Sequence, residues 1–151
     1  MLDITKISSY REDNRLEAKL ATGGLPESIW ETYSAFANTY GGVILLGVEE
    51  LPDKSLRIQG LLDAEEMAAA LRARLGDPRV ASVDLLSPGQ LRVVDTERGQ
   101  IIVMEVPRAG EDQQPVYVGG NPYTGSYFRS GDGDYRIPRE DVAAMLARRK
   151  H

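Results

Sequence analysis

The stretch from residue 36 to residue 50, FANTYGGVILLGVEE, constrains the fold of this chain more than any other. Its glycine pair, Gly41 and Gly42, follows a segment of helical pattern, as glycine commonly does at the end of a helix. The apolar run over 43–48 shows no polar alternation, which predicts a strand buried on both faces. The run stops at Glu49 and Glu50, which either end the strand in water or belong to a functional site.

Three segments have the features of helices. Residues 27–40 repeat apolar side chains every three or four positions, which gives a helix one apolar face. Residues 63–75 follow the same spacing, and Asp63 with Glu66 has the pattern of a capping box. A terminal helix is predicted over 137–151, because acidic residues fall in its first turn and basic residues in its last, which suits the helix dipole.

Short β-rich segments predict the rest of the sheet. They cover residues 80–86, 91–95 and 101–106, with turn-like sequences between them, and a short strand at 116–118 within a polar loop. This mixture predicts an α+β fold: a single domain with a mixed, mostly antiparallel sheet and two or three packed helices.

Composition excludes several classes of function. The chain has 151 residues and no cysteine, so we expect one domain without disulfides, thiolate catalysis or cysteine zinc sites. Its single histidine, His151, is the last residue, and no Gly-Lys pair of a P-loop occurs. The longest apolar run is far too short to span a bilayer and a signal-peptide pattern is missing, so we expect a cytoplasmic protein with no membrane contact.

The formal net charge of −5 opposes general binding to polyanions. Nucleic-acid binding would therefore need a local basic patch or basic surface beyond residue 151. Such a patch is suggested by residues 117–136, where aromatic side chains that can stack on bases alternate with arginines that can engage phosphate. The alternative is a hairpin that packs its aromatics into the core. Asp132 and Asp134 lie there in a glycine-rich stretch without an EF-hand pattern, which predicts a plain turn.

Two glutamates in the charged segment 10–19, Glu12 and Glu17, lie five positions apart. Neither a helix nor a strand would bring their side chains together, but a bend between them would. One interpretation is a solvated, salt-bridged segment. The other groups them with Glu49 or Glu50 into a cluster that holds Mg²⁺ or Mn²⁺ through oxygen ligands and activates water for phosphodiester cleavage.

Four stretches, in this order and spacing, resemble the Schlafen-type AlbA-like domain, formerly called the divergent AAA domain. They are RLEAKLA with Glu12 upstream, AFANTYGGVILLGVEE, QPVYV and YFRSGDGDYRIPREDV. The resemblance covers a core of about residues 12–145 within one domain over 1–151. It implies a DNA-binding domain of a bacterial transcriptional regulator, with further domains after residue 151 and no cofactor for binding. It also implies that Asn38, Gly41 and Gly42 are structural hallmarks of the helix-to-strand junction.

The resemblance also implies a second activity. In animal Schlafen proteins the related core is a metal-dependent endoribonuclease that uses two glutamates five positions apart and a later aspartate. Glu12 and Glu17 match the pair, and Glu50 stands where the aspartate would be, which departs from the pattern. The implied cofactor is Mg²⁺ or Mn²⁺, with Glu12, Glu17 and Glu50 as its ligands.

Three hypotheses follow. The first is a module that binds DNA or RNA, with contacts from Lys19, Tyr123, Tyr127, Arg129 and Arg136. The second is a metal-dependent nuclease that uses Glu12, Glu17 and Glu50. The third is a protein-interaction or dimerisation domain, which would form a stable oligomer such as a homodimer without affinity for nucleic acid.

Overall fold

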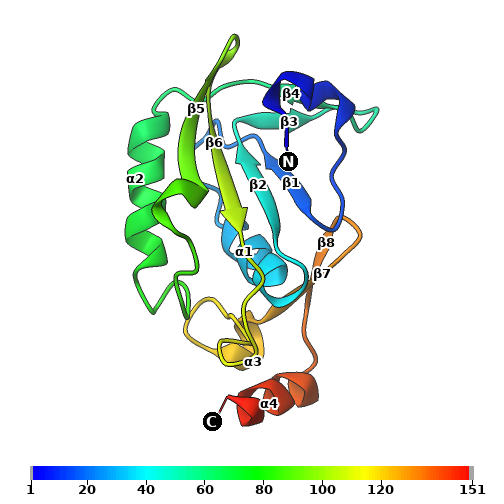
Figure 1. Ribbon diagram of the computed structural model, residues 1–151, viewed down its shortest axis with the longest axis vertical. Helices are drawn as coiled ribbons and strands as arrows, with labels where there is room; N and C mark the ends of the chain where they lie inside the picture. The colour runs from blue at the N-terminus through cyan, green and yellow to red at the C-terminus, as the bar shows by residue number, and fades with distance from the viewer. Residues whose placement is uncertain (1, 150–151) are drawn as a thin grey trace.

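A four-stranded sheet lies at the centre of the structure, a computed structural model that describes residues 2–149. Across the sheet the strands are β1 (Leu16–Lys19), β2 (Gly42–Leu46), β6 (Gly99–Val106) and β5 (Leu91–Thr96) (Figure 1). β1 and β2 are parallel, whereas the other neighbouring strands are antiparallel. The predicted α+β fold with a mixed, mostly antiparallel sheet is therefore confirmed.

Two helices cover one face of this sheet. α1 (Ile29–Asn38) and α2 (Ala64–Leu75) share a hydrophobic core with β2 and β6, to which Phe36, Leu71 and Met104 contribute. Both helices were predicted from their apolar spacing. Asp63 is the N-cap of α2, but within residues 2–149 its side chain makes no capping hydrogen bond, so the predicted capping box is wrong.

The opposite face of the sheet is covered by the 3₁₀ helix η1 (Ile4–Ser9) and by a two-stranded sheet of β3 (Val48–Glu50) and β4 (Leu56–Ile58). The prediction that residues 43–48 form a single strand is therefore wrong, because β2 ends at Leu46 and β3 begins at Val48. Gly47 separates β2 from β3 with a φ of 90°, and its carbonyl accepts hydrogen bonds from the N–H groups of Gln59 and Gly60. The chain leaves the main sheet there because glycine adopts this positive φ at little cost.

Two predicted strands are wrong. Residues 80–86 and 116–118 form isolated bridges, Ala81 with Val118 and Tyr117 with Ser126, instead of a strand ladder in the described chain. The backbone of 80–86 is satisfied in other ways, for example by the hydrogen bond from the Leu85 N–H to the Tyr33 hydroxyl. Single partners of this kind replace the regular pairing that β propensity alone predicts. The connection between β4 and β5 also contains the short 3₁₀ helix η2 (Pro88–Gln90).

The last part of the described chain forms a hairpin and two helices. β7 (Tyr127–Ser130) packs on α1 and pairs with β8 (Gly133–Arg136), and the turn predicted at the glycine-rich stretch joins them. The one-turn helix α3 (Pro122–Gly125) precedes the hairpin, and α4 (Arg139–Arg148) follows it. α4 extends from the lower end of the molecule (Figure 1). The terminal helix is shorter than predicted, and the expectations for Lys150 and His151 fall outside the described residues.

None of the helices in residues 2–149 has the length and apolar character required to cross a membrane.

Candidate nucleic-acid interface and carboxylate cluster

A bend brings Glu12 back onto the strand that carries Glu17. The Asp13 N–H donates to the Leu16 carbonyl at 3.1 Å, and the turn between them leads directly into β1. The Glu12 carboxyl group then accepts a hydrogen bond from the Ala18 N–H at 3.0 Å. The bend that the cluster hypothesis needed is present.

Glu50 lies against Glu12. Burial raises the pKa of Glu12 from its ordinary value of 4.5 to about 7, against the opposing effect of the Ala18 N–H. The charges of Glu17 and Glu50 and the interaction of its carboxyl group with that of Glu50 raise the pKa further. The three glutamates therefore occupy one region, with Glu50 supplied by β3 from the small sheet.

Glu17 is held by two cations. Its Oε1 lies 2.8 Å from Nη2 of Arg129, and its Oε2 lies 3.4 Å from Nζ of Lys19. Glu50 forms a long ion pair, 3.7 Å, with the exposed Lys54. Among residues 2–149, no three His, Asp or Glu side chains are arranged to hold a metal ion. The oxygen donors of Glu12 and Glu50 suit Mg²⁺ or Mn²⁺, whereas Glu17 faces its cationic partners.

Glu49 has a different role from Glu50. It accepts hydrogen bonds from Gln59 at 2.6 Å and from Arg57 at 2.8 Å, and these contacts hold its pKa below the ordinary value. Glu49 therefore ends its strand at the surface. Of the two interpretations of this glutamate pair, a strand end in water suits Glu49. Glu50, which lies near Glu12, is the one positioned for a site.

Arg129 is buried, with only 3% of its surface exposed. It donates to the Asp13 carbonyl and to the carboxylates of Glu17 and Asp134, the last at 2.7 Å, and its guanidinium lies over the ring of Phe36. The prediction of Arg129 as a surface contact to nucleic acid is therefore corrected. Because β7 packs on α1, alternation along the strand turns this side chain inward.

The other residues predicted to contact nucleic acid have side chains that are partly buried or already in contact with neighbours. Lys19 has a side chain only 11% exposed and donates to Ser28 Oγ and Glu17. Tyr123 is covered by the guanidinium of Arg139, 4.1 Å from the ring centre, and Tyr127 is half-buried opposite Arg136. These positions contribute to the fold at least as much as to the surface.

The outer strand β8 presents the most accessible pair. Tyr135 is 53% exposed and its ring packs against Phe128 at 5.8 Å. Arg136 is exposed, and within the described part of the chain its guanidinium has no hydrogen-bond or ion-pair partner. Tyr135 was missing from the predicted contact set. In the hairpin register Phe128 pairs with Tyr135, one position along from the inward Arg129, so both rings lie on the opposite face of the hairpin. The sequence alone does not give this register.

The helix-to-strand junction is built from close backbone contacts. The side-chain amide of Asn38 donates to the carbonyls of Val116 and Tyr127 and accepts from the Val116 N–H. Gly41 has a φ of 73°, and a Cβ there would lie 2.8 Å from the Val106 carbonyl oxygen. These residues hold the junction and β7 together, which gives them a structural role.

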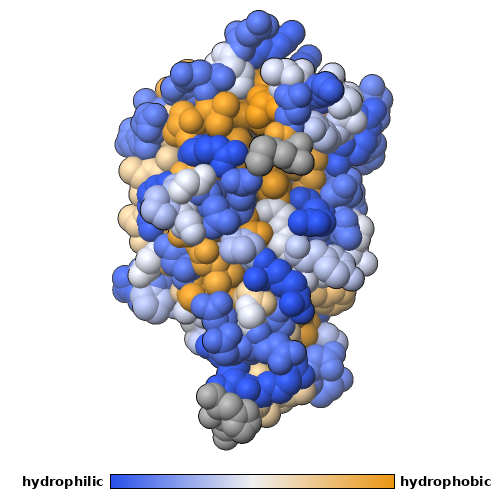
Figure 2. All heavy atoms as spheres, in the orientation of Figure 1, coloured by the Kyte–Doolittle hydropathy of each residue, from blue (hydrophilic) through white to orange (hydrophobic). Residues whose placement is uncertain are grey.

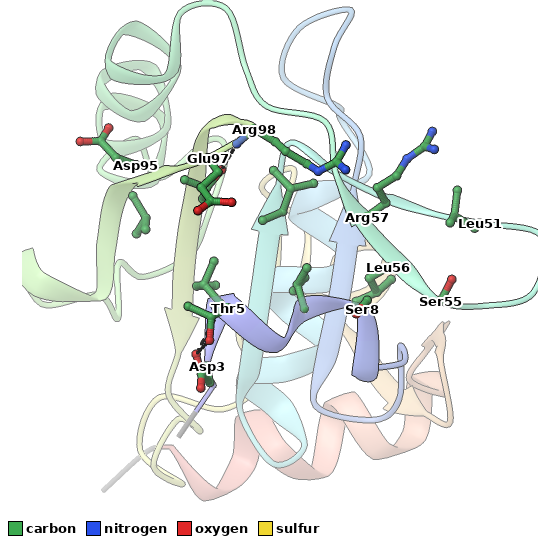
Figure 3. A pocket seen from close by; sticks show the side chains of 15 residues that line it. Asp3, Thr5, Ser8, Leu51, Ser55, Leu56, Arg57, Asp95, Glu97 and Arg98 are labelled. Carbon is green, nitrogen blue, oxygen red and sulfur yellow. Dashed lines mark hydrogen bonds between the residues drawn. The ribbon is translucent and has the colours of Figure 1, made fainter.

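A groove of about 1130 Å³ lies elsewhere, between η1, β4 and the β5–β6 hairpin (Figure 3). Its lining includes both acidic and basic side chains, among them Asp95, Glu97, Arg57 and Arg98 (Figure 3). Apolar surface gathers over the sheet on this side of the molecule (Figure 2). The mixed charges favour no phosphate site there, because they partly cancel one another.

Comparisons with known proteins place these observations in a family context. The sequence profile of the family described as Schlafen, AlbA_2 matches residues 12–138. The chain is similar to the solution structure of the N-terminal domain of an ATP-dependent DNA helicase RecG-related protein from Nitrosomonas europaea. Identity is 26% and the TM-score is 0.64, over 89% of this chain and 90% of that one.

A second solved structure shares the fold at lower identity. The DIP2311 protein from Corynebacterium diphtheriae is 14% identical, with a TM-score of 0.57, over 95% of this chain and 27% of that one. No curated protein matches the chain.

Proposed function

Because this chain belongs to the Schlafen AlbA_2 family, we propose that it is a nucleic-acid-binding domain that contacts its ligand through the β7–β8 hairpin. We further propose that the ligand is DNA and that the domain serves a bacterial transcriptional regulator. The name of the Nitrosomonas europaea relative, a DNA helicase RecG-related protein, supports DNA as the ligand.

The observation that carries the proposal is the exposure of Tyr135 and Arg136, which alternation along β8 turns to opposite faces of the hairpin. An aromatic ring can stack on a base and a guanidinium without a partner can pair with phosphate. The buried Arg129 anchors this hairpin to β1, so the pair is presented by a fixed element. A local contact of this kind is compatible with a net charge of −5.

The test is binding of labelled duplex DNA, single-stranded DNA and structured RNA, measured by fluorescence anisotropy across a salt series. We expect salt-sensitive binding that weakens about tenfold in Arg136→Ala, with the slope against log salt reduced by about one. Arg79→Ala is the matched control, because Arg79 is 90% exposed and pairs with Asp77 in another loop. Binding that is absent at low salt for every ligand would contradict the proposal and favour an interaction or dimerisation domain.

A second candidate, a metal-dependent nuclease, is favoured by the contact between Glu12 and Glu50. Two neighbouring carboxyl groups form an oxygen-rich position that a divalent cation could occupy. Glu12 and Glu50 would hold Mg²⁺ or Mn²⁺, and Glu17 would be kept in place by Arg129 and Lys19. When bound, the ion would supply an activated water for phosphodiester cleavage.

This candidate predicts a defined effect of Glu50→Gln. We expect Mn²⁺ binding, measured by calorimetry, and Mn²⁺-dependent RNA cleavage, measured on a denaturing gel, to be lost in this variant. Glu49→Gln is the control, because Glu49 is adjacent in sequence but faces Arg57 and Gln59 at the surface. Equal Mn²⁺ binding by both variants would exclude Glu50 as a ligand.

A further inference from the structure

A second groove, of about 550 Å³, separates α4 from the hairpin. One wall is a single face of α4, formed by Asp141, Ala144, Met145 and Arg148 at helical spacing. The other wall includes Phe128 of β7, and Ile137 lies at the connection between them. The volume falls within the range of small-molecule sites.

The groove beside α4 is open because this helix makes few contacts with the rest of the domain. Among its described residues only Val142 is buried. Arg139 at its start stacks on Tyr123, and Arg149 just after its end donates to the Pro115 carbonyl at 3.4 Å. The face from Asp141 to Arg148 is therefore available to a ligand.

The chemistry of the walls is that of a base-binding slot. Phe128 offers a flat apolar surface, with the ring of its cross-strand neighbour Tyr135 centred 5.8 Å away, and Met145 adds a polarizable thioether. Asp141 brings a carboxylate that can accept from the amino group of a base. Arg148 is exposed, and in residues 2–149 its guanidinium has no hydrogen-bond or ion-pair partner, so it can meet a phosphate.

We propose that this groove takes one unpaired base of a single-stranded nucleic acid, which stacks on Phe128 while Arg148 contacts the adjoining phosphate. This inference rests on the proposed nucleic-acid binding and narrows its substrate to unpaired strands. A base in a duplex cannot enter, because its faces are covered by neighbouring bases.

The test uses an oligonucleotide that carries the fluorescent base 2-aminopurine, alone and annealed to its complement. We expect the single strand to bind more tightly than the duplex, with fluorescence quenched on stacking. Ala144→Trp fills the groove from an exposed helix position and should weaken single-strand binding about tenfold and abolish the quenching. Ala143→Trp adds the same side chain at the adjacent exposed position, which does not line the groove, and should leave both unchanged.

The outcomes separate this inference from the proposed function. Unchanged affinity and quenching in Ala144→Trp would overturn the groove as a base site, while a loss of binding in Arg136→Ala would still support nucleic-acid binding. Failure of the parent chain to bind any oligonucleotide would overturn both. A dimer that Ala144→Trp dissociates, measured by light scattering, would assign the groove to a second copy and overturn the inference. Circular dichroism of both tryptophan variants checks that the fold is retained.

Discussion

Glu12 binds its proton more tightly in the folded chain than in the unfolded one. Its half-buried carboxyl group lies near Glu17 and against Glu50, and water in the unfolded chain would separate all three charges. The protonation of Glu12 therefore makes the free energy of unfolding depend on pH.

The sign of this link is defined by the direction of the pKa shift. Between the ordinary value of 4.5 and the folded value of about 7, folded Glu12 holds a proton that the unfolded chain has released. The stabilisation from this residue is present below pH 4.5 and is lost as the pH rises to about 7. We expect Glu12→Gln to remove this component, so that its melting temperature, measured by calorimetry, falls less over this window than that of the parent chain.

Glu49→Gln provides the control for this measurement. The pKa of Glu49 is lowered, so its contribution is lost as the pH falls through the folded pKa, which is the opposite direction. An unchanged pH dependence in Glu12→Gln would show that Glu12 does not carry the effect.

At the scale of elements, the buried Arg129 joins the β7–β8 hairpin to β1. It bridges Glu17 and Asp134, whose side chains are 14% and 16% exposed, so both carboxylates depend on the same guanidinium. Removal of this cation would take away the ion pair of Asp134 and leave Glu17 with Lys19, and both carboxylates are poorly solvated.

We therefore expect Arg129→Met to lower the free energy of unfolding by about 3 kcal/mol or more, measured by chemical denaturation. Arg136→Met on the same hairpin is the matched control and should change it by less than about 0.5 kcal/mol, because Arg136 is exposed. Adding Glu17→Gln and Asp134→Asn to Arg129→Met should restore part of the loss. Equal effects of the two methionine variants would mean that the buried network does not anchor the hairpin.

Sequence reasoning succeeded for elements whose pattern is local. The helix around Phe36 and the hairpin of β5 and β6 follow from apolar spacing and turn residues, and both are present. It failed where the partner is distant. Residues 80–86 have β propensity but form no strand ladder in the described chain. The sequence also does not show whether Gly47 lies inside a strand or between two strands.

The same limit applied to the candidate site. Glu12 and Glu17 come together through one local bend, and their spacing in the sequence already indicates that such a bend is required for their meeting. Arg129 and Glu17 are separated by 112 positions, so only the hairpin register and its packing on α1 reveal their ion pair. An aromatic and cationic segment read from sequence alone cannot tell the inward arginine from the outward one.

At the scale of the whole molecule, the negative net charge is compatible with phosphate contacts by the exposed arginines Arg136 and Arg148. Arg136 lies on β8 and Arg148 on α4, the last strand and the last helix of the described chain, and α4 forms the lower end of the molecule (Figure 1). The carboxylate region lies where β1 meets β3, and its Glu17 is joined to the β7–β8 hairpin by Arg129. Within this region Glu17 is already paired with Arg129 and Lys19, so its charge opposes a bound phosphate less than an unpaired carboxylate would.

The departure of the chain from the main sheet at Gly47 has a consequence for how this fold can diversify. Glu12 and Glu17 belong to the framework that carries the core, whereas Glu50 is carried on a two-stranded arm with its own pairing. Substitutions in that arm can add, move or remove the third carboxylate while the pairing of β1, β2 and β6 stays intact. Chemistry and architecture are therefore separable in this chain, and a catalytic and a purely binding version can share one scaffold.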